Sequence, residues 1–279
     1  MRKKIATTAK YIFLTVVSVI SVFPFFWMIV AATNRSVDVT KGTLIPGNYF
    51  LENLKTLLAS DLQYVSAFKN SLVIAIVTTT LAMIVSSAAG YAFVVYKTKR
   101  REQIFNFIFL SMMVPFAALM VPLFRLFSKF GNMGPLKVIA LNTPMSVVII
   151  SIATAFLIFF FKQNAQNFPR ELIEAARIDG LSEIKIFTRI FMPTMKSTYA
   201  AAIVVTFMSS WNNYLWPLIA LQSPEKRTLP LVISAMGSSY TPDYGMIMTA
   251  VVIATLPTAL IFFFMQKQFV AGMTGSVKG

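Results

Sequence analysis

Six long apolar stretches divide the sequence, and they constrain its fold more than any other feature. They cover residues 11–31, 67–96, 104–127, 141–161, 199–221 and 244–265, and charged side chains are nearly absent from them. A helix of about 20 apolar residues spans the hydrocarbon core of a bilayer. Since a helix also satisfies its own backbone hydrogen bonds in lipid, the pattern predicts an all-α membrane protein with six transmembrane helices.

The composition agrees with this class and excludes several others. Apolar residues make up 57% of the chain and charged residues 13%, whereas soluble domains carry about 25% charged residues. The chain has no Cys and no His, which excludes disulfides, thiolate metal sites and the Ser-His-Asp triad. No carboxylate pair lies within the apolar stretches either, so we find no nucleophile and base for an intramembrane enzyme.

The distribution of positive charge predicts the orientation of the chain. Sixteen of the 25 Lys and Arg residues lie in residues 1–10, 97–103, 162–197 and 266–279. Positive residues collect on the cytoplasmic side of membrane proteins, so both termini are expected inside the cell. Since the basic residues flank the apolar stretches, the net charge of +15 is not expected to bind nucleic acid. Residues 11–31 exceed the ~7–15-residue core of a signal peptide and are expected to remain as the first span.

A charged run with helical patterning, residues 168–193, separates the fourth and fifth stretches. Glu171 and Glu174 follow Pro169, and the N-terminus of a helix favours both Pro and carboxylates. Gly180 suits the left-handed position that ends a helix. The run therefore predicts a helix-turn-helix held in water beside the membrane.

The second helix of this run is expected to begin at Ser182, which can cap it, and to stop or bend at Pro193. Its apolar residues recur at helical spacing and are expected on one face. This set comprises Ile184, Phe187, Ile190 and Phe191.

The run from Glu174 to Gly180, with Asp179 before the Gly and Ile190-Phe-Met-Pro193 after it, resembles the EAA loop of ABC importer permeases. It is most similar to the carbohydrate-uptake, maltose-permease-G-like subfamily, with Leu181 where that family usually has Ala and Met192 where it usually has Leu. The resemblance implies a cytoplasmic coupling loop that docks on an ATPase subunit. Its coupling residues would be Glu174, Ala175, Ala176, Asp179, Gly180, Phe187 and Pro193.

Further motifs extend the resemblance along the chain, among them Asn70-Ser71, Met113-Val-Pro115 and Leu256-Pro257. They begin near residue 67, and the earlier residues match more in hydropathy than in motif. We therefore divide the chain into an N-terminal span with an external loop, residues 1–66, and a permease core, residues 67–279. The core is expected to end in a short flexible tail, residues 266–279.

Neutral polar and aromatic residues are the candidates for the substrate pathway, because aromatic faces, amides and hydroxyls bind sugars. This set comprises Trp211, Asn212, Asn213, Tyr214 and Ser71. Thr78 and Thr79 are weaker candidates, since helix packing explains them equally well. Trp216 suits an aromatic belt at the membrane interface as well as it suits a sugar. The family usually has an acidic residue where this chain has Asn213, so no charge is expected to act there.

The resemblance implies the permease subunit of an importer that carries a sugar, in particular an oligosaccharide, by alternating access across the cytoplasmic (inner) membrane. Its expected partners are a second homologous permease, two ATP-binding subunits and an extracellular sugar-binding protein. The chain has no P-loop motif, so we expect no cofactor on it, and ATP on the partner. The alternative is an ion-coupled secondary transporter, which the lack of Asp or Glu within any stretch disfavours.

Overall fold

The computed structural model describes residues 2–273 of the 279-residue chain. These residues form helices joined by turns, with no β-strand among them, so the all-α prediction is confirmed. The chain divides into two compact units. The first comprises Met1–Val65 and Val232–Leu256, and the second comprises Ser66–Leu231 and Pro257–Gly279.

Four helices in the described part of the chain are long and apolar enough to cross a membrane. They are Thr7–Ala32, Tyr64–Val95, Pro144–Ala165 and Tyr244–Val270. Two bent helix pairs would raise the number to six if each pair formed one span. These pairs are Lys99–Met113 with Phe116–Phe130, and Glu183–Thr194 with Lys196–Trp211.

The first unit contains α1 (Arg2–Ala32), α2 (Ser36–Thr40) and α3 (Phe50–Ala59), with most of α14 (Leu229–Gly237) and the first part of α15 (Tyr244–Met273). Buried polar side chains hold these segments together. The Asn53 amide donates hydrogen bonds to the carbonyl oxygens of Ala32 and Asn34, both at 3.0 Å. The Tyr64 hydroxyl donates to the carbonyl oxygen of Ala250 at 2.8 Å. The segment between the first and second apolar stretches is thus structured and contains α2 and α3.

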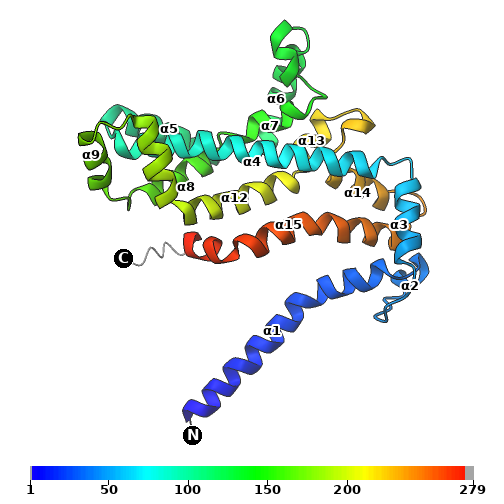
Figure 1. Ribbon diagram of the computed structural model, residues 1–279. Helices are drawn as coiled ribbons and strands as arrows, with labels where there is room; N and C mark the ends of the chain where they lie inside the picture. The colour runs from blue at the N-terminus through cyan, green and yellow to red at the C-terminus, as the bar shows by residue number, and fades with distance from the viewer. Residues whose placement is uncertain (1, 274–279) are drawn as a thin grey trace. The chain divides into compact units, whose positions relative to one another are not determined.

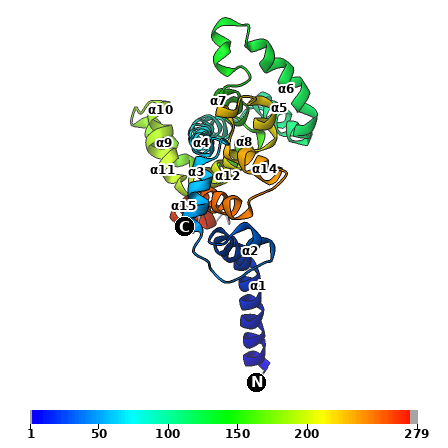
Figure 2. The same ribbon diagram turned by 90° about the vertical axis from the view of Figure 1, so that its right-hand side faces the viewer.

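The second unit is built around α4 (Tyr64–Val95). Figures 1 and 2 show α8 (Ala155–Ala165) and α12 (Lys196–Trp211) beside it. At Gly90, an added Cβ would lie 2.6 Å from the Cβ of Phe161 on α8, a separation that atoms do not tolerate. The small residues near the end of α4 therefore permit close packing of the two helices.

The third apolar stretch does not form the continuous helix that we predicted. It divides into α5 (Lys99–Leu110), the 3₁₀ turn η1 (Ser111–Met113) and α6 (Phe116–Phe130), and the two parts bend by 103°. The break falls at Pro115, which lacks the N–H that a continuing helix needs. Pro122 lies inside α6 without ending it, so the sequence alone did not identify which proline interrupts the stretch.

Other predicted stretches are also broken. The fourth consists of α7 (Pro144–Val148), the 3₁₀ turn η3 (Ile149–Ser151) and α8, preceded by η2 (Gly134–Ile139). The fifth ends its main helix at Trp211 and resumes as α13 (Leu215–Ala220). The segment between the fifth and sixth stretches contains η5 (Pro224–Lys226) and α14.

The last apolar stretch extends further than predicted. Helix α15 continues to Met273, so the first eight residues of the predicted flexible tail are helical. Residues 274–279 lie outside the described residues.

Candidate functional site

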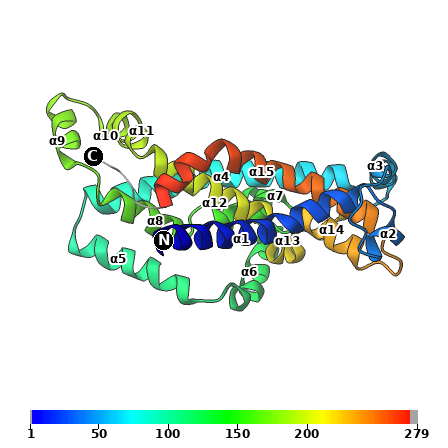
Figure 3. The same cartoon turned by 90° about the horizontal axis from the view of Figure 1, so that it is seen from below.

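Residues 170–194 form a compact turn of helices, here called the knuckle. It comprises α9 (Arg170–Ile178), α10 (Glu183–Ile186), the π-helical turn η4 (Phe187–Phe191) and α11 (Met192–Thr194). Figures 1 and 3 show α9 beyond the end of the second unit's main helices, away from α6 and α13. A bend of 82° separates the end of the knuckle from α12, which confirms the predicted break near Pro193.

The turn of the knuckle is closed by two backbone hydrogen bonds. The Leu181 N–H donates to the carbonyl oxygen of Ala176, and the Gly180 N–H donates to that of Arg177, each at 3.0 Å. This pair defines a Schellman motif, whose left-handed residue is usually Gly. Gly180 has φ of +75°, as predicted, and an added Cβ would meet nothing within 4 Å. Ser182 precedes α10 as expected, but its side chain forms no capping bond.

Glu183, at the start of α10, forms hydrogen bonds to both α9 and α4. Its Oε1 accepts a hydrogen bond from Arg177 Nε at 2.8 Å, and its Oε2 accepts one from the Tyr91 hydroxyl at 3.1 Å. The hydrogen bond from Arg177, followed by that from Tyr96, lowers the pKa of Glu183. The carboxylate therefore stays charged while it joins α9, α10 and α4.

The knuckle has a buried face and an exposed apolar face. Inward side chains pack with α4, α8 and α12 in one cluster, and they include Ile173, Ala176, Ile186 and Phe191. On the outside, Ile178 is 86% exposed and Ile184 is 76% exposed. The prediction that Ile184 shares one face with Phe187, Ile190 and Phe191 is therefore wrong, because Ile184 is exposed and Ile186 is buried instead. The π-helical turn that follows changes the residue spacing per turn, so a pattern read at α-helical period fails here.

The predicted coupling residues lie on both faces of the knuckle. Glu174, Ala175, Asp179, Gly180 and Pro193 are exposed, whereas Ala176 is buried. Phe187 is half-buried, with its ring centroid 5.4 Å from that of Tyr91. Our sequence interpretation missed Ile178 and Ile184. The sequence feature that could have identified them is a pair of large apolar residues on either side of a glycine turn in a charged segment.

A wide cleft of about 440 Å³ opens in the second unit. Its lining comprises Phe116, Ile150, Ser151, Thr154, Ser209, Asn212, Asn213, Tyr214 and Leu215. Three predicted pathway residues, Asn212, Asn213 and Tyr214, thus come together with an aromatic ring and hydroxyl groups. Pockets of this size with a few converging polar groups bind small molecules in many proteins.

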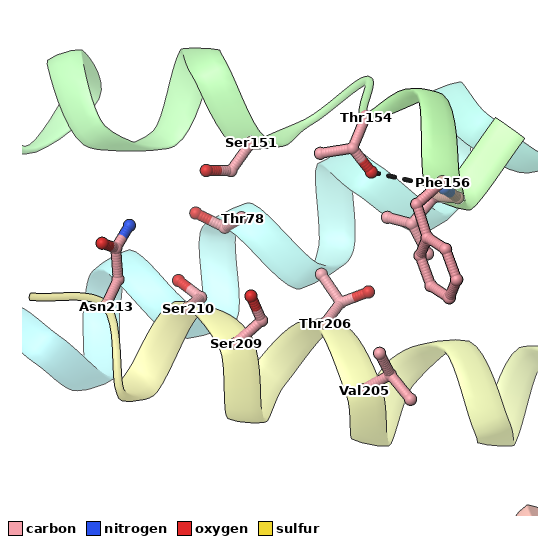
Figure 4. Close-up of a pocket in the computed structure, with 10 residues that line it drawn as sticks. Thr78, Ser151, Thr154, Phe156, Val205, Thr206, Ser209, Ser210 and Asn213 are labelled. Carbon is pink, nitrogen blue, oxygen red and sulfur yellow. Dashed lines mark hydrogen bonds between the residues drawn. The ribbon is translucent and has the colours of Figure 1, made fainter. Parts of the chain in front are cut away.

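A narrow cleft of about 100 Å³ shares four lining residues with the wide cleft. The shared residues are Ser151, Thr154, Ser209 and Asn213. The narrow cleft adds Thr78, Phe156, Leu157, Val205, Thr206 and Ser210. Figure 4 shows Ser209, Ser210 and Asn213 pointing from the α12 side toward Thr78 and Ser151. The two clefts adjoin at the four shared residues, whose side chains are all polar.

The remaining predicted pathway residues are packed in the protein and do not line either cleft. Trp211 is buried, with its ring centroid 5.5 Å from that of Phe68. Ser71 is buried and accepts a hydrogen bond from the Leu229 N–H at 2.8 Å. Trp216 is fully buried and donates to the carbonyl oxygen of Ser146 at 2.9 Å, which is a packing position.

We also did not predict an ion pair between a buried lysine and a partly exposed glutamate. Lys162 on α8 is buried, and its Nζ lies 2.7 Å from Glu102 Oε1 and 3.4 Å from the centroid of the Phe105 ring. The pair holds the start of α5 against α8. The sequence places these residues 60 positions apart, in two segments that we predicted to be cytoplasmic, so no local pattern joins them.

Comparison with known families identifies the class of protein. A family described as "Binding-protein-dependent transport system inner membrane component" matches residues 82–275. The chain belongs to this family. The inner membrane component is a transport subunit and not an enzyme, and its ATPase is a separate subunit.

Relatives of this permease cover nearly its whole length. The chain is 45% identical over 279 residues to the lactose transport system permease protein LacG of Rhizobium radiobacter, covering 100% of this chain and 98% of that protein. It is 36% identical to the arabinooligosaccharides transport system permease protein AraQ of Bacillus subtilis (strain 168), covering 96% and 94%. It is 33% identical to the sn-glycerol-3-phosphate transport system permease protein UgpE of Salmonella typhi, covering 92% of each.

Solved structures support the fold. The permease is similar, with a TM-score of 0.82 and 18% identity, to a chain of a bacterial ABC transporter involved in the import of the acidic polysaccharide alginate. The match covers 96% of this chain and 98% of that chain. At this identity the similarity establishes the fold of a transporter subunit, and the substrate has to be argued from the clefts.

Proposed function

We propose that this chain is one of two permease subunits in an ATP-driven importer that carries a sugar, in particular an oligosaccharide, into the cell. The other subunits would be a homologous permease, two ATP-binding subunits and an extracellular sugar-binding protein. The chain would cross the inner membrane six times, with both termini in the cytoplasm. ATP would bind only to the partner subunits, and substrate would pass by alternating access.

The exposed apolar face of the knuckle supports the proposal that this chain contacts an ATPase subunit. Ile178 and Ile184 are large, strongly exposed apolar side chains in a charged segment, and we assign them to a contact with a protein partner. Glu174 and Asp179 lie beside them and are exposed, so they can pair with basic residues of an ATPase subunit. The residues we assign to this contact are Glu174, Ala175, Ala176, Asp179, Gly180, Phe187 and Pro193, to which the structure leads us to add Ile178 and Ile184.

The wide cleft supports the substrate part of the proposal. Asn212 and Asn213 can donate and accept hydrogen bonds, while the rings of Phe116 and Tyr214 can face the C–H surface of a sugar. Ser71 and Trp211, which are both buried, would contribute to packing and would not contact the sugar in this arrangement. The names of relatives that carry lactose and arabinooligosaccharides agree with this class of substrate.

Purification of the tagged chain from its native membrane in mild detergent tests the proposal. We expect two ATP-binding subunits and a second permease to co-purify with it, and sugar to stimulate ATP hydrolysis when the binding protein is added. A chain that purifies without an ATP-binding subunit and supports ion-driven uptake would contradict the proposal and favour a secondary transporter.

A further inference from the structure

Two buried hydroxyl groups in the narrow cleft have no hydrogen-bond partner. Thr78 on α4 is 1% exposed and Thr206 on α12 is 6% exposed, and the Oγ1 atoms of both are unpaired. A threonine in a helix usually donates its hydroxyl to the carbonyl oxygen four residues before it. Leaving a buried hydroxyl unpaired costs free energy. Three further hydroxyls among the described residues are also buried and unpaired, those of Thr79, Tyr199 and Thr228, but only Thr78 and Thr206 line this cleft, where a bound ligand could supply the missing partner.

The rest of the lining indicates what that partner is. Seven of its ten residues carry a hydroxyl or an amide group, and the other three are Phe156, Leu157 and Val205. None of the described residues that line either cleft is charged. Hydroxyls and amides both donate and accept hydrogen bonds, and an aromatic ring offers an apolar face. This combination matches a ligand that has many hydroxyl groups and no charge.

The cleft also lies at a suitable depth along the candidate span. Thr78 is the fifteenth residue of the 32-residue helix α4, about 21 Å from one end and about 26 Å from the other at ~1.5 Å per residue. Substrate sites of membrane transporters cluster near the middle of the bilayer. Polar residues at that depth are costly and mark functional sites.

We infer that the narrow cleft is a subsite for a neutral sugar ring, in which Thr78 and Thr206 exchange hydrogen bonds with ring hydroxyls. This inference rests on the proposed function and adds a selectivity rule to it. A carboxylate or phosphate group would lose its hydration in the cleft and find no cation there, so anionic sugars are disfavoured. The chain would then differ in substrate charge from the transporters of sn-glycerol-3-phosphate and alginate to which it is similar.

Valine substitutions test the two hydroxyls, because valine keeps the shape of threonine and removes only the polar group. Thr228→Val is the matched control, since Thr228 is 4% exposed and unpaired but does not line either cleft. Cells that lack only this chain would be complemented with each variant. Uptake would be measured with radiolabelled lactose, raffinose and arabinotriose, and with the anions galacturonate and sn-glycerol-3-phosphate.

We expect one or more of the neutral sugars to be imported and neither anion. Thr78→Val and Thr206→Val should each lower kcat/KM for that sugar about three- to tenfold, as expected for one lost hydrogen bond, while Thr228→Val behaves as wild type. Import of an anion, or equal kcat/KM in all three variants, would overturn the inference and leave the proposed function standing. No import of any sugar by wild type would overturn the proposed function itself.

A labelling experiment measures whether sugar occupies the narrow cleft, and it does not depend on transport. The chain has no Cys, so Ser210→Cys places a single thiol in the narrow cleft and Val37→Cys places one at an exposed site in the first unit. In the purified complex, the imported neutral sugar should slow modification of Ser210→Cys and leave Val37→Cys unchanged. Equal rates with and without sugar at Ser210→Cys would contradict the inference.

Discussion

The hydroxyl group of Tyr91 donates a hydrogen bond to Oε2 of Glu183 at 3.1 Å, which ties the end of α4 to the second half of the knuckle. Helix α4 also carries Thr78, at the narrow cleft. We therefore expect a movement of the knuckle to be passed to the helix that lines the cleft. This contact provides a short physical route between the surface assigned to the ATPase and the surface assigned to the sugar.

The first prediction is that Tyr91→Phe weakens coupling without preventing assembly. The ring contacts with Phe187 and Phe191, at 5.4 and 4.9 Å between centroids, remain in this variant, and only the hydroxyl is lost. The missing hydrogen bond should reduce stability by about 1 kcal/mol and raise the number of ATP molecules hydrolysed per sugar imported. Tyr11→Phe, at an exposed tyrosine of α1, is the control. An unchanged ATP-to-sugar ratio in Tyr91→Phe would show that the contact plays no part in coupling.

The second prediction concerns pH. The hydrogen bond from Arg177 lowers the pKa of Glu183 in the folded protein. A carboxyl with a lowered folded pKa stabilises the protein above its unfolded pKa, about 4.3 for Glu, and this contribution is lost as pH falls through the folded pKa. The melting temperature of Glu183→Gln should therefore lie below that of wild type near pH 7. The difference should close in acid, and a difference that grows in acid would contradict this assignment.

The sequence predicted those features that depend on local chemistry. The glycine turn at Gly180 and the break near Pro193 follow from backbone geometry, and both are confirmed. The close packing at Gly90 follows from the small residues around it. Helix formation in the apolar stretches follows from their length and composition.

The features that we did not predict from the sequence depend on contacts between distant segments. Pro115 and Pro122 look equivalent in the sequence, but only Pro115 interrupts the stretch. Ser71 and Trp211 carry suitable groups for a sugar, but neighbouring segments bury them. Thr78 and Thr206 line one cleft only because α4 and α12, which are far apart in the sequence, pack beside it.

The third prediction separates local strain from lost docking at the turn. Gly180 and Gly42 have φ of +75° and +73°, and a Cβ at either residue meets nothing within 4 Å. Valine should therefore strain the backbone at both sites and reduce stability by a similar amount, about 1–2 kcal/mol. Only Gly180→Val should also obstruct the ATPase and abolish sugar-stimulated ATP hydrolysis. If Gly42→Val loses as much ATPase during purification as Gly180→Val, the loss arises from strain and the docking role is wrong.

The fourth prediction concerns orientation in the membrane. Single cysteines at Lys99 and Gly180 should be shielded in intact cells from an impermeant thiol reagent added outside. Cysteines at Ile45 and Tyr240, both strongly exposed side chains, should react. Mass spectrometry of the labelled chain gives the readout, and permeabilised cells provide the control. Labelling of Gly180→Cys from outside would contradict a cytoplasmic knuckle.

Site-specific photo-crosslinking tests whether the exposed apolar face of the knuckle docks on an ATPase subunit, as we propose. A crosslinking amino acid would replace Ile178 or Ile184, with Ile45, which is 75% exposed in the first unit, as the matched control. In the intact complex, we expect a covalent adduct of permease and ATPase from positions 178 and 184 and none from position 45. No adduct from either knuckle position, in a complex that still contains the ATPase and imports sugar, would contradict the claim.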